Sequence, residues 1–250
     1  MSAFGRTVFA IIIVQPWPHI SPTQHTFKDK QIENDRAMKA SASCYDEATG
    51  KMIGTERSHT AVIVSPDGRY RAYAENEAVA SPITKGDSAE CQSTSKLFVA
   101  GPNSMDFLSV LVISPLPERH GNYIELVDWS PVGHQLLLLQ GWWEWGSDVG
   151  GNFVRVYDAD VQKLSPESFV EDHFSKHFGR SCAAIFRAVG FSSAGKVLLR
   201  AEPWFDFGED TPAADSCVQK EGLWLIDFAV PAVSQLQDDY QVQHYGKIVP

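Results

Sequence analysis

The stretch Ile124 to Asp148, IELVDWSPVGHQLLLLQGWWEWGSD, decides the fold because the chain repeats it. Shifted by 62 residues without a gap, it aligns with residues 186 to 210, FRAVGFSSAGKVLLRAEPWFDFGED. Its first half occurs once more, 65 residues upstream, as VSPDGRY at residues 64 to 70. A fixed period of this size indicates an array of similar structural units.

Each unit has the pattern of antiparallel β-structure. In the first unit the β-branched run Thr60 to Val64 is followed by Ser65-Pro66-Asp67-Gly68, in which proline presets φ and glycine accepts a left-handed conformation. A second strand pattern then begins at Arg69. Runs of this kind divide the chain into units of about four strands, at residues 59 to 115, 122 to 180 and 184 to 250.

We expect the fourth strand at Phe107 to Ile113 in the first unit and at Gln241 to Val249 in the third. In the second unit the fourth strand is the least clearly marked, and we expect it near Gln162 to Val170. Radial repetition of such units predicts an all-β, propeller-like array of three to four four-stranded antiparallel blades, preceded by an N-terminal segment of residues 1 to 58. A β-sandwich with irregular strand spacing is the competing architecture.

Composition limits the classes of function. The chain has 250 residues, of which 44% are hydrophobic and 11% aromatic, as in a globular protein. The formal net charge of −10 argues against binding to nucleic acid or to an anionic membrane surface, which both require basic patches. No apolar run reaches the roughly 18 residues of a spanning helix, so we expect a soluble, acidic protein.

The N-terminus has two interpretations. Arg6 followed by the apolar run Thr7 to Val14 has the order of a secretory signal, which would place the protein in the periplasm or outside the cell. The run is short, however, and Gln15-Pro16-Trp17-Pro18 follows it instead of a cleavage site of small residues. The same run also suits a β-strand of a cytoplasmic protein.

The four cysteines contain no CxxC pair, so the spacing of a zinc finger is absent. An even number permits two disulfides in an oxidising compartment, and buried reduced thiols are equally consistent with the sequence. Cys182 and Cys217 are both expected on loops at the same face of the third unit. A disulfide between them is therefore our hypothesis.

The repeated motif resembles a known family. Residues 65 to 73, SPDGRYRAY, resemble the core of the TolB-like, WD40-like propeller repeat, while residues 129 to 133 and 191 to 195 keep only parts of it. The strands that end at Asp158 and Asp227 are similar to the strand that follows in that family. The resemblance covers residues 59 to 250 and implies a propeller. It implies no single function, because such repeats occur in scaffolds, peptidase-gating domains and sugar-recognising proteins.

An aromatic, acidic face is the candidate site. In a four-stranded antiparallel blade, the loops between strands two and three lie on the same face as the connections between blades. The ten residues expected there are Trp142, Trp143, Glu144, Trp145, Asp148, Trp204, Phe205, Asp206, Phe207 and Asp210. Exposed rings beside carboxylates hold peptides or sugars by stacking and directed hydrogen bonds. Alternatively, most of these rings pack between neighbouring blades as core.

The sequence predicts binding rather than catalysis. It contains no nucleophile elbow, phosphate-binding loop, zinc-protease helix or dinucleotide fingerprint. The order of a calcium-binding EF-hand is missing, and although His173, His177 and Cys182 would suit zinc on a helix, surface histidines are commoner, so we expect no metal and no cofactor.

The expected partner is a protein or peptide, with carbohydrate as the second choice. Self-association through open blade edges is a further expectation. The alternatives are a glycan-hydrolysing propeller that uses Glu144, Asp206 or Asp210, and an accessory propeller domain of a serine peptidase.

Overall fold

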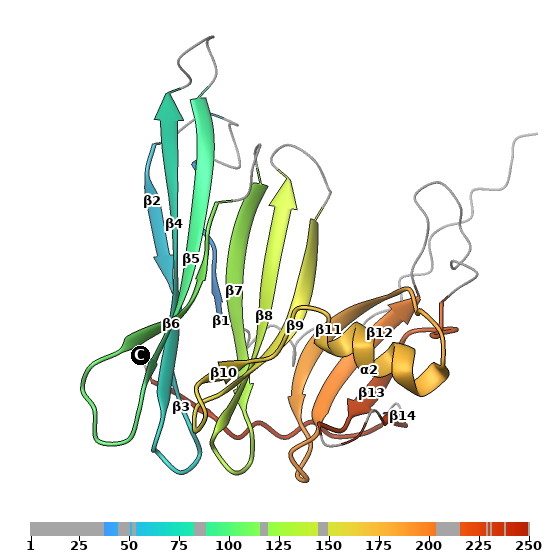
Figure 1. Ribbon diagram of the computed structural model, residues 1–250. Coiled ribbons are helices and arrows are strands. Elements are labelled where there is room, and N and C mark those ends of the chain that lie inside the picture. The colour runs from blue at the N-terminus through green and yellow to red at the C-terminus, as the bar shows by residue number, and fades with distance from the viewer. Residues whose placement is uncertain are drawn as a thin grey trace, which may run out of the picture.

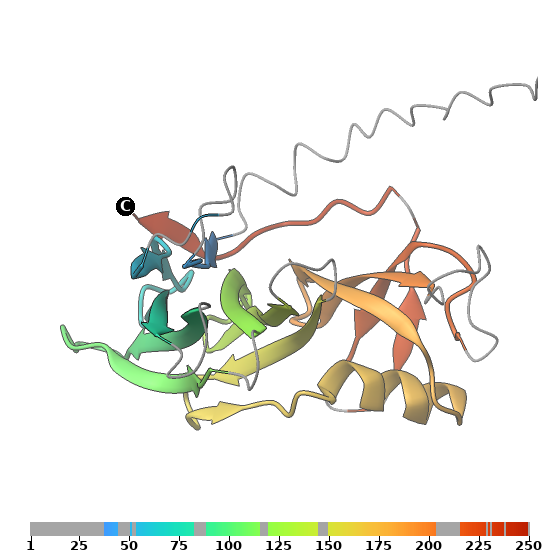
Figure 2. The ribbon, with the colours of Figure 1, turned by 90° about the horizontal axis from the view of Figure 1, so that it is seen from above.

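The computed structural model describes residues 38–44, 51, 54–82, 89–115, 120–144, 150–203, 216–228, 230, 232–237 and 239–249. Antiparallel β-strands dominate these ranges and form three sheets that stand side by side (Figure 1). The expected all-β class is therefore confirmed. The described strands do not close into a ring, as the view from above shows (Figure 2). The signal-like run Thr7 to Val14 lies outside the described residues.

The first sheet contains the first copy of the repeat. Its successive strands are β3 (Val62–Val64), β4 (Arg71–Pro82), β5 (Ala89–Ala100) and β6 (Leu108–Ile113). Two further strands join it: β2 (Glu56–His59) pairs with the distal part of β4, and the C-terminal β15 (Lys247–Val249) pairs with β3. Strand β6 forms one edge of this sheet.

The second sheet stands in the middle of the array. Its strands are β7 (His120–Trp129), β8 (Gln135–Glu144), β9 (Gly150–Asp158) and β10 (Lys163–Leu164), with β1 (Met38–Ala40) added to the free edge of β7. Only the two-residue β10 occupies the region where we expected a fourth strand. Helix α2 (Phe169–Phe178) follows, and it ends at Gly179 in the left-handed conformation.

The third sheet contains β11 (Ala184–Phe191), β12 (Val197–Pro203), β13 (Gly222–Ile226) and β14 (Val233–Gln235). Helix α2 lies against the core between this sheet and the second one, where Phe174 contacts Phe186 and Trp224. At ten residues, α2 is too short and too polar to cross a membrane, and the described part of the chain holds no longer helix.

The three aligned stretches of sequence fold into three similar turns, of which the third closes one residue earlier, at Lys196. In each turn the serine amide donates to a carbonyl across the turn, and the glycine amide donates back to the serine carbonyl, at Ser65, Ser130 and Ser192. The serine hydroxyl also accepts an amide from the returning strand in each case. The turn glycines Gly68, Gly133 and Gly195 have φ of 74°, 86° and 76°, a region that β-carbons disfavour.

The second sheet is buried on both faces, and this explains the four consecutive leucines of β8. Leu137 and Leu139 point into the core shared with the third sheet, whereas Leu136 and Leu138 point into the core shared with the first. Because side chains alternate along a strand, only a sheet covered on both sides accepts an uninterrupted apolar run. Trp129 adds a hydrogen bond between sheets, from its Nε1 to the carbonyl of Ile63 at 3.2 Å.

The two outer faces of the array carry charged pairs. On the first sheet the buried alanines of β4 face inward, and the exposed Glu75 with the ion pair Arg57–Glu77 faces outward, beside the contacting rings of Tyr73, Phe98 and Phe107. On the third sheet the cross-strand ion pairs Arg187–Glu202 and Arg200–Glu221 face outward.

The C-terminal segment does not form the fourth strand of the third sheet, so that expectation was wrong. Strand β14 takes that place, and residues 241 to 249 instead cross the inner edges of all three sheets (Figure 2). Gln243 forms a bridge with Phe191 of the third sheet, and β15 pairs with β3 of the first. Between them, the amides of Tyr245 and Gly246 donate to the carboxylate of Asp128 in the second sheet.

Asp128 should therefore be critical for stability. It is fully buried and accepts the amides of Tyr245 at 3.1 Å, Gly246 at 2.9 Å and Trp129 at 2.9 Å. Asp128→Ala should lower the free energy of unfolding by about 3 kcal/mol, because buried amides lose a charged acceptor. Urea denaturation measures this loss. Asp239→Ala, an exposed aspartate of the same segment, is the control, and an equal loss in both variants would contradict this role.

Glu171 of helix α2 should make stability depend on pH. Its Oε2 is buried without a hydrogen-bond partner, and burial together with the neighbouring Asp172 raises the pKa of its carboxyl above the ordinary 4.5. Because the pKa of this carboxyl is higher in the folded than in the unfolded state, its contribution to stability is fully present at pH values below the unfolded-state pKa. The contribution is lost as the pH rises through the folded-state pKa. Glu171→Gln should therefore raise the melting temperature at pH 7 and leave it unchanged near pH 4. An equal gain at both pH values would argue against burial as the cause.

Candidate functional site

Three of the ten residues of the expected aromatic, acidic face are described, and all three belong to strand β8. They are Trp142, Trp143 and Glu144, and each is partly buried. The others lie outside the described residues: Trp145, Asp148, Trp204, Phe205, Asp206, Phe207 and Asp210.

The two described tryptophans do not share a surface. We expected a loop from residue 141, but β8 stays paired on both sides as far as Trp143, which lies opposite Gly121 of β7 and Gly150 of β9. Neighbouring residues of a strand point to opposite faces of the sheet. Trp142 therefore lies on the side of the first sheet, over Gly151, and Trp143 on the side of the third.

Trp143 and Tyr123 lie flat on the second sheet because glycines stand opposite them. Tyr123 pairs with Gly141, and a β-carbon at Gly141 or at Gly121 would overlap the Tyr123 or the Trp143 ring, respectively. The two ring centroids are 5.9 Å apart, with the ring planes tilted by 33°. Aromatic side chains that cover glycines on the next strand are a recognised means of stabilising a sheet.

Strand β1 adds a cation to these rings. The Nζ of Lys39 lies 3.9 Å from the centroid of Tyr123 and 6.0 Å from that of Trp143, within reach of a cation–π interaction. Lys39 is exposed, so the outer side of these rings is reached from solvent. We refer to Lys39, Tyr123 and Trp143 as the aromatic patch.

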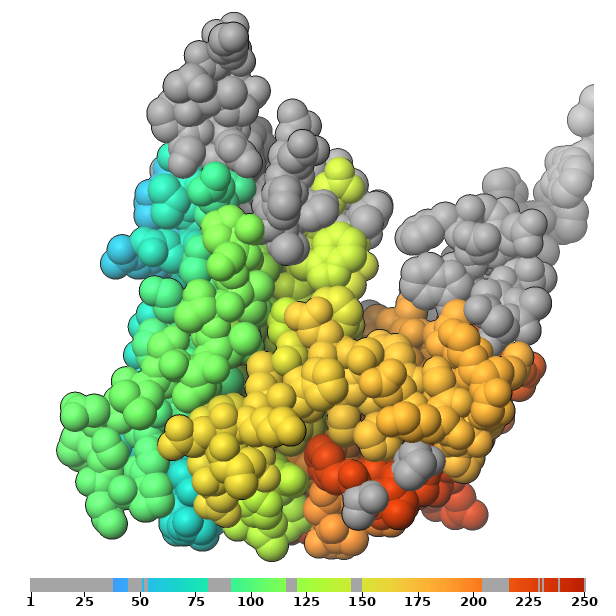
Figure 3. Space-filling model, viewed as in Figure 1, coloured from blue at the N-terminus to red at the C-terminus, as the bar shows by residue number. Residues whose placement is uncertain are grey.

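Charges of both signs surround the aromatic patch. Burial raises the pKa of the Tyr123 hydroxyl and Glu125 raises it further, whereas Asn152 and Arg187 act in the opposite direction. Arg187 comes from β11 of the third sheet, so that sheet borders the patch. In the space-filling view the yellow-green upper end of the second sheet rises above the orange surface of helix α2 and the third sheet (Figure 3). The aromatic patch is thus bordered by charges of both signs, with Lys39 over its two rings.

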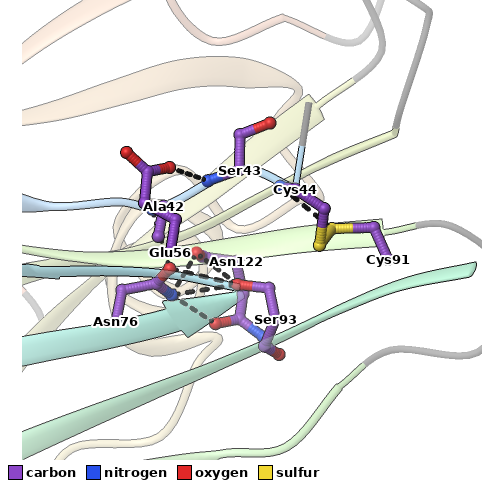
Figure 4. Close-up of a disulfide and its surroundings, with 8 residues drawn as sticks. All are labelled: Ala42, Ser43, Cys44, Glu56, Asn76, Cys91, Ser93 and Asn122. Atoms are coloured by element: carbon purple, nitrogen blue, oxygen red, sulfur yellow. Dashed lines mark hydrogen bonds between the residues drawn. A yellow bond between two sulfur atoms is a disulfide. The ribbon is translucent and has the colours of Figure 1, made fainter. Parts of the chain in front are cut away.

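A disulfide and a buried polar cluster position β1. The chain leaving β1 is joined to the first sheet by the Cys44–Cys91 disulfide, and the amide of Ala42 donates to Oδ1 of Asn76 at 2.8 Å (Figure 4). Asn76 in turn donates from its Nδ2 to the carbonyl of Asn122 in β7, again at 2.8 Å.

The other polar groups of this cluster are also hydrogen-bonded. Ser95 donates from its hydroxyl to Oδ1 of Asn122 at 2.7 Å, and Nδ2 of Asn122 donates to the carbonyl of Ser93 at 2.6 Å. All four side chains, those of Asn76, Ser93, Ser95 and Asn122, are at most 1% exposed. A satisfied buried network specifies one geometry for its surroundings. It therefore fixes the first sheet, β1 and β7 relative to one another.

The second disulfide joins Cys182 and Cys217, the pair that the sequence analysis singled out. It connects the segment after α2 to the chain that leads into β13, beside the core between the second and third sheets. Since Cys182 is oxidised, it is not a zinc ligand together with His173 and His177. The two histidines contact backbone atoms, the carbonyl of Phe169 and the amide of Val233. No three His, Cys, Asp or Glu side chains gather as a metal site within the described ranges.

Comparison with known proteins assigns no relationship. No protein-family model matches the chain, and no curated protein sequence is similar to it.

Sequence reasoning missed Lys39 and Tyr123, which complete the aromatic patch. The signal for Tyr123 was the glycine at position 141, a residue that allows a ring on the neighbouring strand to lie flat. Gly141 predicts the position of Tyr123 only when the register between β7 and β8, which pairs these two residues, is known. Lys39 had no signal, because its place depends on the pairing of β1 with β7.

Removing the Cys44–Cys91 disulfide should loosen the aromatic patch. The double variant Cys44→Ala, Cys91→Ala should lower the free energy of unfolding by about 3 kcal/mol, since a crosslink of this span restricts the unfolded chain. Amide exchange of Met38 to Ala40, followed by mass spectrometry, should become faster. The matched double variant Cys182→Ala, Cys217→Ala should also be destabilised but should leave exchange in β1 unchanged under native conditions. Equal acceleration in both would show that β1 is held by other contacts.

Proposed function

We propose that this protein is a non-catalytic binding or scaffold protein, and that it recognises a protein or peptide in extended conformation through a surface built on the aromatic patch. The residues of the expected aromatic, acidic face that lie outside the described ranges belong to the same proposal, namely Trp145, Asp148, Trp204, Phe205, Asp206, Phe207 and Asp210. Carbohydrate is the second class of ligand that this surface would suit.

The arrangement of Lys39, Tyr123 and Trp143 carries the proposal. Two rings lie flat over glycines at the end of a rigid sheet, with one edge of the surface basic and Glu125 nearby. Flat aromatic surface gives contact area at low entropic cost, and charges of both signs orient a polar chain. The sheet beneath is held by the buried cluster of Asn76 and Asn122, so the surface is formed before a ligand arrives.

Two further inferences accompany this proposal. Three successive antiparallel sheets with the same serine–glycine turn support an origin from propeller-type repeats, here in an open arrangement rather than a ring. The two disulfides support residence in an oxidising compartment, because cytosolic thiols are kept reduced.

Substitutions at the two adjacent tryptophans test the site. Peptides selected from a displayed random library against the purified chain should lose about 2 kcal/mol of binding free energy with Trp143→Ala, as expected of a central aromatic anchor. Trp142→Ala is the matched control, since this ring lies on the opposite face of the same strand. Isothermal titration with the selected peptides measures both. Equal losses in the two variants would place the binding site elsewhere.

A glycan array distinguishes the alternatives. Retention of a glycan that depends on Trp143 and releases no reducing ends would indicate carbohydrate binding. Release of reducing ends would replace the proposal by a glycan-hydrolysing function. If the chain retained neither peptides nor glycans, the proposed binding role would be rejected.

A further inference from the structure

A cavity of about 290 Å³ opens between the first and second sheets, at the end of the strands opposite the aromatic patch. It lies among the turn before β4, the connection from β5 to β6, and the turn after β9. Its apolar part comes from Val99, Leu108, Val110 and Ala159. Its polar part includes two tyrosines and two aspartates, Tyr70, Tyr157, Asp106 and Asp160.

One carboxylate of this cavity has no partner. Asp160 accepts the hydroxyl of Tyr70 at 2.5 Å and pairs with Arg69 at 3.2 Å, and the Tyr70 bond is the main reason why the pKa of Asp160 is lowered. Asp106 forms no side-chain hydrogen bond or ion pair within the described part of the chain. No lysine, arginine or histidine is among the described lining residues, although Arg69 pairs with Asp160 and Arg71 donates to the carbonyl of Ser104 at the cavity wall. Neither arginine forms an ion pair with Asp106 in the described part of the chain, so a further cation would be attracted to this carboxylate.

Tyr157 is a second polar residue of the cavity whose side chain forms no hydrogen bond with the described residues. It is only 3% exposed and lines the cavity, yet its hydroxyl has no hydrogen-bond partner in the described ranges. The hydroxyl is open to the cavity, so water or a ligand atom there can form the hydrogen bond that the described residues do not supply. The acceptor lone pairs of this hydroxyl suit an N–H donor.

Among the described residues, the strand beside the cavity lies at the edge of its sheet. Strand β6 pairs only with β5 within these ranges, and its sequence LSVLVI has no charge and no proline. Leu108 and Val112 are 64% and 53% exposed. Natural sheets usually block such edges with charges, proline or a covering segment, and an open apolar edge accepts a strand from another chain. The register shift at Val110 directs this residue, like Leu108, to the cavity.

We infer that β6 and the adjoining cavity form a second binding site, in which an extended segment of a partner protein pairs with β6 and inserts a lysine or arginine side chain into the cavity. The aliphatic stem contacts Leu108 and Val110, and the cationic end lies between Asp106 and the hydroxyl of Tyr157. The partner segment alternates apolar residues with a single basic anchor, because every second side chain of an added strand points to the same side. This site is independent of the aromatic patch.

The probe is a fluorescein-labelled octapeptide of alternating threonine and valine, in which arginine replaces one central valine. Matched peptides contain glutamate or norleucine at this position, and another has N-methyl groups on alternate backbone amides. Fluorescence anisotropy with the full, disulfide-intact chain should show binding of the arginine peptide about tenfold tighter than that of the glutamate or norleucine peptide. The N-methylated peptide should not bind, because it cannot complete the hydrogen bonds of the edge strand.

Variants locate the site on the protein. Leu108→Lys places a like charge in the cavity and should weaken the arginine peptide about tenfold, whereas Val132→Lys, at an equally exposed valine of another turn, should leave it unchanged. Asp106→Asn should weaken the arginine peptide and not the norleucine peptide, with Asp239→Asn as its control. Trp143→Ala should have no effect here, which separates this site from the proposed function.

Three results would overturn the inference. The first is a failure of the arginine peptide to bind, and the second is equal binding of all the peptides. The third is equal loss with Leu108→Lys and Val132→Lys, which would indicate a nonspecific charge effect.

Discussion

The buried carboxylate of Asp128 is the contact on which the arrangement of the three sheets depends. It accepts the amides of Tyr245 and Gly246, which lie 117 and 118 residues further along the chain. The segment held there bridges to β11 on one side and pairs as β15 with β3 on the other. The first strands of the three sheets, β3, β7 and β11, would each leave an open inner edge. The C-terminal segment covers β3 and contacts β11, and β1 pairs with β7. The described sheets, which do not form a closed ring, are thus connected along their inner edges by distant parts of the chain.

The second sheet contributes one end to each of the two candidate binding surfaces. Because it is buried on both faces, its strands are fixed by packing on two cores, and its two ends are rigid platforms. One end presents Tyr123 and Trp143, with Lys39 positioned through the Cys44–Cys91 disulfide and the Asn76 cluster. The other end forms one wall of the cavity beside β6. Both proposed sites therefore use side chains on strands or tight turns, and neither requires the core to rearrange.

The two surfaces suit different features of a partner. The aromatic patch offers ring faces and charges of both signs, and suits a polar extended chain or a sugar. The β6 edge offers backbone hydrogen bonds and a cavity with an unpaired carboxylate, and suits a strand with a basic anchor. A scaffold with a binding surface at each end of its central sheet would hold two segments at once, which increases the effective concentration of each at the other.

The all-β class and the three repeated turns could be predicted from the sequence alone, and the disulfide between Cys182 and Cys217 was a hypothesis that the structure contains. These follow from local patterns, such as Ser-Pro-Asp-Gly between β-branched runs, or from the position of loops within a repeated unit. Only the tertiary structure decided that Trp142 and Trp143 face opposite ways, that Lys39 joins Tyr123, and that residues 241 to 249 leave the third sheet for the first. The physical reason is that strand pairing between distant segments, and the register it takes, depend on which edges and faces remain uncovered once the sheets pack together. No local pattern of residues encodes that.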